Sequence, residues 1–378
     1  MTTNNHNFGD NNTLGGWQII GADNTFGDYN KLGNCNTLGY GNTFGKYNEF
    51  DYGNTFGNNS QFSHYNTFGD SNQFGNSCTF GDNNKLGNFN KLGDCNTLGN
   101  DNTLGNYNTL GNDNKLGDCN TLGNYNTLGK DNKLGDFNTL GKDNKLGNGN
   151  KLGNFNTLGN FNTLGDCNTL GDCNTLGYNN KLGNDNKLGD CNTLGNYNKL
   201  GNGNTLGNGN KLGNFNKLGD CNTLGNFNTL GKDNKLGNGN KLGDCNKLGN
   251  FNKLGDCNTL GNDNTLGNCN TLGNDNTLGN WNELGNSFKF GKRLKMEGVE
   301  VINLMTMANI DGSGRQIQII AHTKGLLIRA GCFVGTLDAF CAKAESENKT
   351  RYSKVVRAAA EAFYADIIAT GETNGWNE

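Results

Sequence analysis

A strict period of six residues runs through most of this chain. Every sixth residue from Phe8 to Phe290 is Phe, Leu or Ile, and no insertion or deletion interrupts the series. The repeated unit reads x-Asn-Thr/Lys-Leu-Gly-Asn/Asp, where x is a variable position. A unit of six residues cannot bury a core by itself and must stack on its neighbours. The period therefore predicts a solenoid.

Alternation within the unit predicts which side chains face the interior. In the unit that starts at Asp101, the side chains of Asn102 and Leu104 lie on one side of a strand and Thr103 lies on the other. Leu104 must face inward, so Asn102 does too, and a buried amide requires hydrogen-bond partners. Each Asn can bond the Asn side chain or the backbone of the turns above and below, as in the amide ladders of stacked sheets. We expect Gly105 to give the backbone the freedom to turn the corner.

The variable positions fall into three classes when units eighteen residues apart are compared. One class is rich in aromatic residues, another has none, and the third is mixed. This segregation predicts that three units form one triangular turn of 18 residues, and that the 48 units make about 16 turns. The chain contains no proline, as expected where every backbone N–H is needed in a ladder.

The repeat resembles the hexapeptide-repeat family of left-handed parallel β-helix proteins. The stretch Leu86-Gly87-Asn88-Phe89-Asn90-Lys91 fits that family's pattern, except that Asn replaces the usual small inward residue. The resemblance implies the left hand of the coil, whereas crossover sterics alone would favour the right hand. The expected fold is mainly β, a left-handed parallel β-helix solenoid with a small α+β C-terminal domain.

The same resemblance raises the alternative of an enzyme, because this family is best known for trimeric acyltransferases. It implies a histidine that acts as general base in a groove between subunits. Of the three histidines here, His64 at a corner or His322 in the C-terminal segment would have to serve. No long loop interrupts the repeats to cover an acyl donor. We therefore favour a non-catalytic role without a cofactor and keep acyl transfer as the alternative.

The C-terminal segment has an ordinary composition. We expect the repeat domain over residues 1–291 and an α+β domain over 292–378 that caps or oligomerises the solenoid. Strands are predicted over 299–307, 316–322 and 326–333, with a turn at Asp311-Gly312-Ser313-Gly314. Helices are predicted from the N-cap Thr336 to about residue 346 and over 351–370. Residues 308–316 and 329–335 are similar to the tail of uncharacterised enterobacterial prophage proteins, which implies a phage-encoded accessory protein and no activity.

Charge and cysteine usage restrict the partners and the compartment. The net charge of −3 gives no strong field for nucleic acid. The 13 cysteines follow no pairing rule and are interpreted as free thiols in a reducing cytoplasm. No apolar run is long enough for a membrane span, the N-terminus lacks a signal peptide, and metal-ligand spacings are missing. These features predict a soluble protein of the bacterial cytoplasm that neither associates with a membrane nor binds a metal ion.

Three surface features are candidates for function. The aromatic class of variable positions is the interaction face that we favour, for a protein partner or for self-association such as a homotrimer; its members are Phe89, Tyr107, Tyr125, Phe161, Tyr197, Phe215 and Phe251. A lysine row could bind nucleic acid or another polyanion, although a solvated face explains it as well; it contains Lys181, Lys199, Lys217, Lys235 and Lys253. A threonine row could bind ice; it contains Thr103, Thr121, Thr139, Thr157, Thr175 and Thr193. We disfavour this interpretation, because the row of variable residues beside it is irregular.

Overall fold

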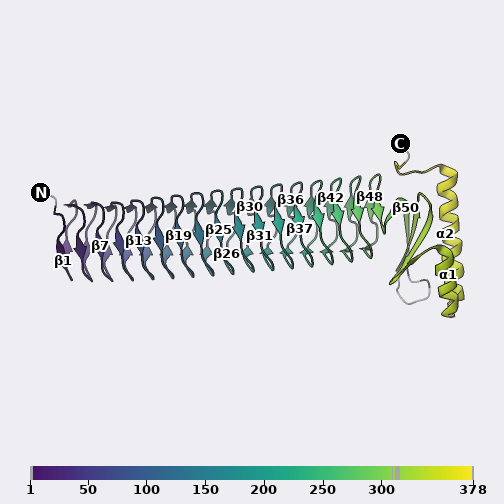
Figure 1. Cartoon of the computed structure of the whole chain (residues 1–378), viewed down its shortest axis with the longest axis horizontal. Helices are drawn as coiled ribbons and strands as arrows, with labels where there is room; N and C mark the ends of the chain where they lie inside the picture. The colour runs from purple at the N-terminus through teal and green to yellow at the C-terminus, as the bar shows by residue number, and fades with distance from the viewer. Residues whose placement is uncertain (1–2, 309, 311–315, 377–378) are drawn as a thin grey trace. The chain divides into compact units, whose positions relative to one another are not determined.

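The chain forms two compact units, Met1–Gly219 and Asp220–Glu378. The structure is a computed structural model that describes residues 3–308, 310 and 316–376. Each unit contains stacked turns of short β-strands (Figure 1).

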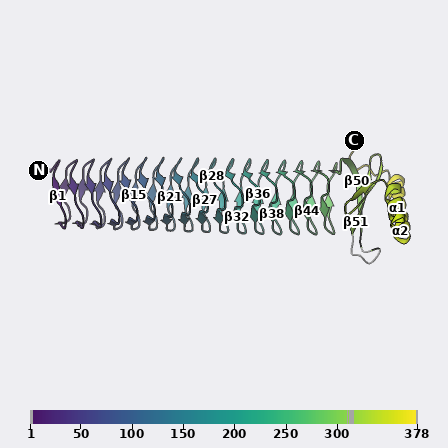
Figure 2. The same cartoon turned by 60° about the horizontal axis from the view of Figure 1, so that its bottom comes forward.

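The first unit is a parallel β-solenoid. Its strands are β1 (Asn7–Gly9), β2 (Thr13–Leu14) and then one two-residue strand every six residues through β36 (Lys217–Leu218). Within this unit a strand pairs in parallel with the strand three places later, as β17 (Thr103–Leu104) does with β20 (Thr121–Leu122). The pairing offset is therefore 18 residues, and three strands complete one turn. Figures 1 and 2 show the stacked turns of this unit from two directions.

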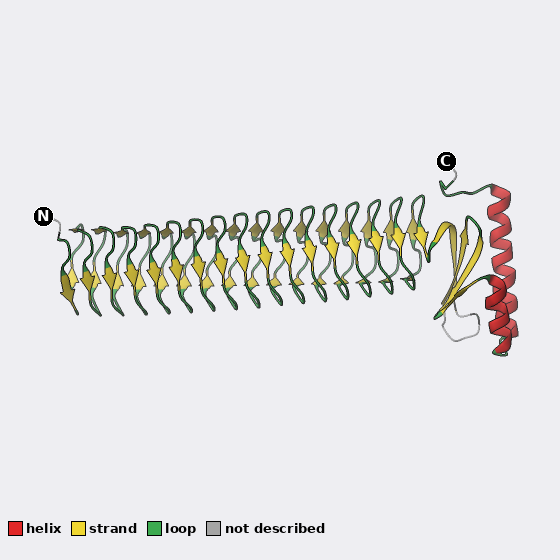
Figure 3. Ribbon diagram, viewed as in Figure 1, coloured by secondary structure: helices red, strands yellow, loops and turns green. Residues whose placement is uncertain are grey.

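The second unit begins with the same repeat and then changes architecture. Its solenoid strands start at β37 (Thr223–Leu224) and recur every six residues through β49 (Lys295–Met296). An antiparallel sheet and two helices follow (Figure 3): β50 (Val299–Ala308), β51 (Gln316–His322), β52 (Gly325–Ala330), β53 (Phe333–Gly335), α1 (Leu337–Ser346) and α2 (Thr350–Thr370).

The predicted fold class is confirmed. The described chain is mainly β, with a parallel solenoid of about 16 turns of about 18 residues and a small C-terminal region that holds a sheet and two helices. The left hand of the coil stays a prediction, as does the domain boundary at residue 291. The parallel ladder runs on past that residue, because β49 pairs with β46 (Thr277–Leu278).

The inward apolar residue fills the core of every turn. Leu104 and Leu122 are each 1% exposed. Where Phe takes this place, the rings of one turn pack edge to face, as Phe44 does with Phe50 at 5.0 Å between ring centroids. Where Phe recurs one turn later the two rings stack, with 5.1 Å between Phe44 and Phe62. The phenylalanine-filled turns therefore have a core of interlocked rings.

The inward asparagine is bonded mainly through its oxygen. Asn84 is fully buried, and its Oδ1 accepts the backbone N–H of Asn66 in the preceding turn at 2.8 Å. Its Nδ2 donates to the carbonyl of Gly81 at 2.8 Å. Within the described residues, the Nδ2 atoms of Asn102 and Asn108 are buried without a hydrogen bond, whereas their oxygens are bonded. Of the two predicted kinds of partner, the inward asparagine Asn84 therefore uses the backbone.

The glycine of the unit serves close packing rather than the corner. Gly105 does not have a positive φ. A Cβ on this residue would lie 2.8 Å from the carbonyl oxygen of Gly87 and 2.6 Å from Oδ1 of Asn88, both in the preceding turn. The positive φ falls instead on the variable position, with 56° at Asp101 and 57° at Tyr107. The expectation that glycine turns the corner is therefore wrong.

The side chain that follows the glycine forms a second ladder along the corner. Oδ1 of Asn88 accepts the backbone N–H of Asn106 in the next turn at 2.7 Å. Oδ1 of Asp70 accepts the N–H of Asn88 in the same way at 2.6 Å. Asn and Asp supply the same Oδ1 acceptor at this position, which explains why the two residues alternate freely there. The inward position needs an uncharged amide, because a buried charge without a partner is strongly unfavourable.

The C-terminal region of the second unit grows out of its last turn. A hairpin through Glu297 and Gly298 pairs β49 with β50 in antiparallel fashion. The order β50, β51, β52, β53 forms an antiparallel sheet. One face of this sheet, including Ile319 and Ile328, packs on helix residues such as Phe340 and Val356. Figures 1 and 3 show the helices on the face of the sheet away from the neighbouring turns of this unit.

Most C-terminal elements match the sequence expectations. The first two predicted strands and both helices are present, and Thr336 Oγ1 accepts the N–H of Ala339 at 3.3 Å as an N-cap. The third predicted strand, 326–333, is divided into β52 and β53, because Gly331 turns the chain with φ of 59°. The predicted turn at residues 311–314 lies outside the described residues.

Candidate functional site

The variable position presents its side chain at a corner with an unfavourable backbone. Phe89, Tyr107 and Tyr125 have φ between 57° and 58°. This left-handed region suits Gly, Asn and Asp, and costs other residues roughly 1–2 kcal/mol each. Aromatic residues are therefore placed at this corner against the local backbone preference.

The predicted interaction residues all belong to one class of variable positions, and we call the corner that this class forms in each unit the aromatic corner. Six of them lie in the first unit and Phe251 lies in the second. Their side chains are between 43% and 55% exposed. Ring centroids are 5.0 Å apart for Phe89 and Tyr107 and 4.9 Å apart for Tyr107 and Tyr125, with nearly parallel planes. Stacking of this kind contributes about 0.5–1.5 kcal/mol per pair, so it offsets much of the backbone cost.

A second aromatic corner was missed in the sequence interpretation. Tyr29, Tyr47 and Tyr65 stack with 5.0 Å between successive centroids. Phe137 and Phe155 stack at 5.1 Å further along the same corner. These residues belong to the class described above as mixed. They could have been found by looking for aromatic residues that follow each other at a spacing of 18, rather than by counting aromatic residues in each class.

The lysine row is present in both units. In the first unit Lys181 lies beside Lys199, and Lys199 lies beside Lys217. In the second unit Lys235 lies beside Lys253. Another sheet of the first unit carries a comparable run, in which residues 115, 133 and 151 are all lysines in neighbouring strands. The row is therefore not a singular feature of one face.

The threonine row occupies consecutive strands of one sheet in the first unit. Thr103 pairs with Thr121, and the run continues through Thr175 and Thr193. The corner beside it carries Asp101, Cys119 and aromatic residues. This corner lacks the second regular rank that flat ice-binding surfaces show.

Both candidate histidines use Nδ1 in the backbone framework of their own unit. His64 takes the position of the corner Asn or Asp, and its Nδ1 accepts the N–H of Asp82 at 2.8 Å. Nδ1 of His322 accepts the N–H of Lys324 at 3.2 Å. Burial, and then Lys324, lowers the pKa of His322. An imidazole that accepts through Nδ1 carries its proton on Nε2 when neutral, so neither neutral ring offers a free lone pair as a general base.

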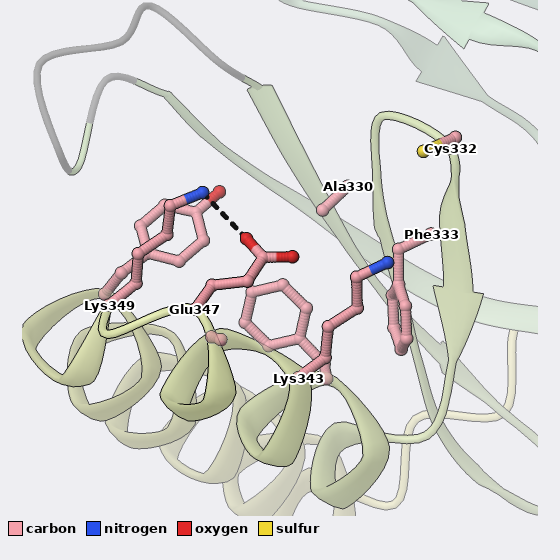
Figure 4. A pocket seen from close by; sticks show the side chains of 9 residues that line it. Ala330, Cys332, Phe333, Lys343, Glu347 and Lys349 are labelled. Atoms are coloured by element: carbon pink, nitrogen blue, oxygen red, sulfur yellow. Dashed lines mark hydrogen bonds and ion pairs between the residues drawn. The ribbon is translucent and has the colours of Figure 1, made fainter.

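A pocket of about 150 Å³ lies in the C-terminal region. Its lining residues come from β52, β53, both helices and the loops between them (Figure 4): Ala330, Cys332, Phe333, Phe340, Lys343, Ala344, Glu347, Lys349 and Tyr352. Lys349 Nζ lies 2.9 Å from a carboxylate oxygen of Glu347, and Lys343 Nζ lies 5.7 Å from the centre of the Phe333 ring. The sequence interpretation did not identify this pocket, because its residues are far apart in the chain and form no motif.

A buried ion pair lies on the other side of the same sheet. Arg329 of β52 is 3.4 Å from Glu297, and their side chains are 8% and 3% exposed. Arg329 also donates to Gln318 at 3.1 Å. Burial raises the pKa of Glu297, and hydrogen bonding by Trp281 and the charge of Arg329 counteract this effect. The pair connects the sheet to the hairpin that leaves the last turn.

Two further findings concern metals and membranes. All 13 cysteines are free thiols. Among the described residues, no three His, Cys, Asp or Glu side chains form a group that could hold a metal ion. Neither described helix has the length and apolar character needed to cross a membrane.

Comparisons with known proteins give a structural match at low identity. No family model matches the sequence, and no curated protein matches it. The crystal structure of a TibC-catalyzed, hyper-glycosylated TibA fragment is similar over 75% of this chain and 99% of that chain, with 7% sequence identity and a TM-score of 0.26. At this level of similarity the match adds nothing to the geometry described above.

Proposed function

We propose that the protein is a non-catalytic rod module that binds a protein partner, or further copies of itself, through the aromatic corner. The observation that supports this proposal is the placement of half-exposed aromatic rings on left-handed backbone in register. Exposed aromatic side chains are enriched at protein interfaces and supply much of their binding energy. The rows between the corners carry Thr and Lys, which suit a solvated surface.

Self-association is the first partner to test. We expect the full chain to be a multimer, such as a trimer, when its mass is measured by light scattering. A triple variant, Phe89→Asn with Tyr107→Asn and Tyr125→Asn, should weaken assembly at least tenfold, because stacked aromatic anchors are lost. Asn occurs naturally at this corner position, as at Asn179, so the fold should survive.

The matched control changes the same three turns at the corner that lacks aromatic residues. It combines Cys95→Asn, Asp113→Asn and Asp131→Asn, all of which have φ between 56° and 58°, and should leave the mass unchanged. The proposal is refuted if the wild-type chain is strictly monomeric and pull-downs with wild type and aromatic triple variant recover the same proteins.

The setting that we propose is the cytoplasm of a bacterium that carries a prophage. It rests on the similarity of residues 308–316 and 329–335 to prophage proteins. In the second of these stretches Arg329 forms the buried ion pair. Fractionation of expressing bacterial cells tests the location, and recovery in the periplasm or the medium would contradict it.

Polyanion binding is a second candidate. It is supported by the neighbouring rungs Lys181, Lys199 and Lys217, which lie close in sequence to the stacked pair of Tyr197 and Phe215. Binding of single-stranded nucleic acid should then weaken as salt rises and disappear when these lysines are replaced by threonine. Salt-independent binding, or none, would exclude it. Acyl transfer has less support, because Nδ1 of both His64 and His322 is already engaged.

A further inference from the structure

The pocket of the C-terminal region combines an apolar interior with a charged rim. Phe340, Ala344 and Tyr352 are buried residues of the two helices that line it. Figure 4 shows Lys343, Glu347 and Lys349 on the helical side, with Ala330 on the strand across from them. A site with this composition favours an apolar group that carries one polar or charged end.

The charges on the rim favour an anion. Lys349 and Glu347 form an ion pair at 2.9 Å, so their charges compensate each other. Lys343 forms no ion pair within the described part of the chain, and its ammonium lies over the Phe333 ring at 5.7 Å. The rim therefore carries one uncompensated positive charge that is held beside an aromatic surface.

The volume limits the size of the apolar group. A pocket of about 150 Å³ is larger than a site for one water molecule and smaller than the roughly 300 Å³ at which sites for drug-sized ligands begin. One aromatic ring or one branched aliphatic side chain matches this space.

We propose that this pocket binds an apolar carboxylate, with the apolar group against Phe340 and Tyr352 and the carboxylate beside Lys343. The shared chemistry can come from a small organic acid or from the free C-terminus of a peptide that ends in an apolar residue. This inference is independent of the aromatic corner, since it concerns only the sheet and helices of the second unit.

The test uses the full chain and two matched pairs of probes. Phenylacetate should bind with a Kd on the order of 1 mM, as expected for a ligand of this size, and neutral phenylacetamide should bind at least tenfold more weakly. A short peptide that ends in phenylalanine with a free carboxylate is compared with its C-terminal amide. Preference for the acid in either pair supports the proposal, and the pair that shows it identifies the source of the carboxylate.

Substitution of Lys343 assigns the charge. Lys343 is exposed, so Lys343→Met should leave the fold intact, as circular dichroism can verify. This change should reduce acid binding about tenfold, as expected for loss of a charge-assisted contact, without affecting the amide probes, and Lys343→Arg should retain most of the affinity. Equal binding of acids and amides, failure of all probes to bind, or no effect of Lys343→Met would overturn the proposal.

Discussion

The buried asparagine ladder can be tested by changing one amide into a carboxyl group. Asn84 is fully buried, accepts the N–H of Asn66 and donates to the carbonyl of Gly81, both at 2.8 Å. The variant Asn84→Asp keeps the shape and the acceptor, but it replaces the donor with an oxygen that faces a carbonyl oxygen. The introduced group must therefore either bury a charge or hold a proton.

The free energy needed to keep the introduced carboxyl group protonated sets the loss of stability. A protonated carboxyl group can donate its O–H to Gly81 and restore the wild-type bonds. Aspartate in the unfolded chain has a pKa of about 3.9, so holding the proton at pH 7 costs about 1.36 kcal/mol for each of roughly 3 pH units, or about 4 kcal/mol. The pKa of the introduced group is raised in the folded state, so the loss of stability is small below about pH 4 and grows as the pH rises. We expect a loss of about 3–4 kcal/mol at pH 7 and less than about 1 kcal/mol at pH 4.

The control is the same substitution at the corner ladder, four residues away in the same six-residue repeat. Oδ1 of Asn88 accepts the N–H of Asn106 at 2.7 Å, and Asp70 fills this role naturally one turn earlier. Asn88→Asp should therefore be nearly neutral at both pH values. Urea unfolding of both variants and wild type at pH 4 and pH 7 measures the difference. Hydrogen exchange near residue 84 localises it, because a solenoid can open turn by turn. An equal loss at both pH values for Asn84→Asp, or a loss at pH 7 no larger than that of the control, would refute the reasoning.

Three further predictions concern the corner, the turn spacing and the buried ion pair. Phe227 is 65% exposed and has a φ of 58°, so Phe227→Asn should raise the free energy of unfolding in urea by about 1 kcal/mol. Tyr107→Asn removes two ring stacks and should show no such gain. Gly105→Ala should lower stability by about 1–3 kcal/mol, because its Cβ would overlap the preceding turn, and an unchanged unfolding midpoint would contradict the packing argument. Arg329→Met should lower the free energy of unfolding by about 3–5 kcal/mol at pH 7. The loss should be smaller at pH 5, because burial already raises the pKa of Glu297 and protonation of Glu297 removes the unpaired charge. A loss that does not depend on pH, or that the second substitution Glu297→Gln does not reduce, would count against this explanation.

The inward residues of the repeat were predictable from the sequence, because alternation and burial leave little choice. Leu104 had to face the core, and the strand geometry then placed Asn102 on the same side. The partners of the amide were less predictable. An amide ladder and a side chain-to-backbone ladder have the same sequence pattern, and only the spacing between turns decides that Asn84 bonds the backbone of Asn66.

The corner and the pocket could be predicted less well. The sequence does not show that the left-handed backbone falls on the variable residue Tyr107, two residues after Gly105. It also does not show that Gly105 is required by the approach of Gly87. The pocket depends on the packing of β52 and β53 against α1 and α2, and the sequence interpretation treated residues 326–333 as one strand. Phe333 lies at the start of β53, after the turn at Gly331 that divides the predicted strand, and Lys343 meets its ring from α1.

The isolated aromatic residues of the corners are the strongest argument for an external partner. Where aromatic residues follow each other at a spacing of 18, as from Phe89 to Tyr125, ring stacking within the chain offsets much of the cost of the left-handed backbone and leaves the rings about half exposed. Phe251 is different, because the variable positions one turn away are Asp233 and Cys269, and its ring is 51% exposed with φ of 60°. Its backbone cost is not offset by a stacked neighbour at this corner. An interface that covers Phe251 would supply the missing contact. Phe251→Asn should therefore weaken assembly and, at the same time, stabilise the isolated chain. A variant that assembles like wild type, or whose isolated chain is less stable than wild type, would argue against the aromatic corner as an interface.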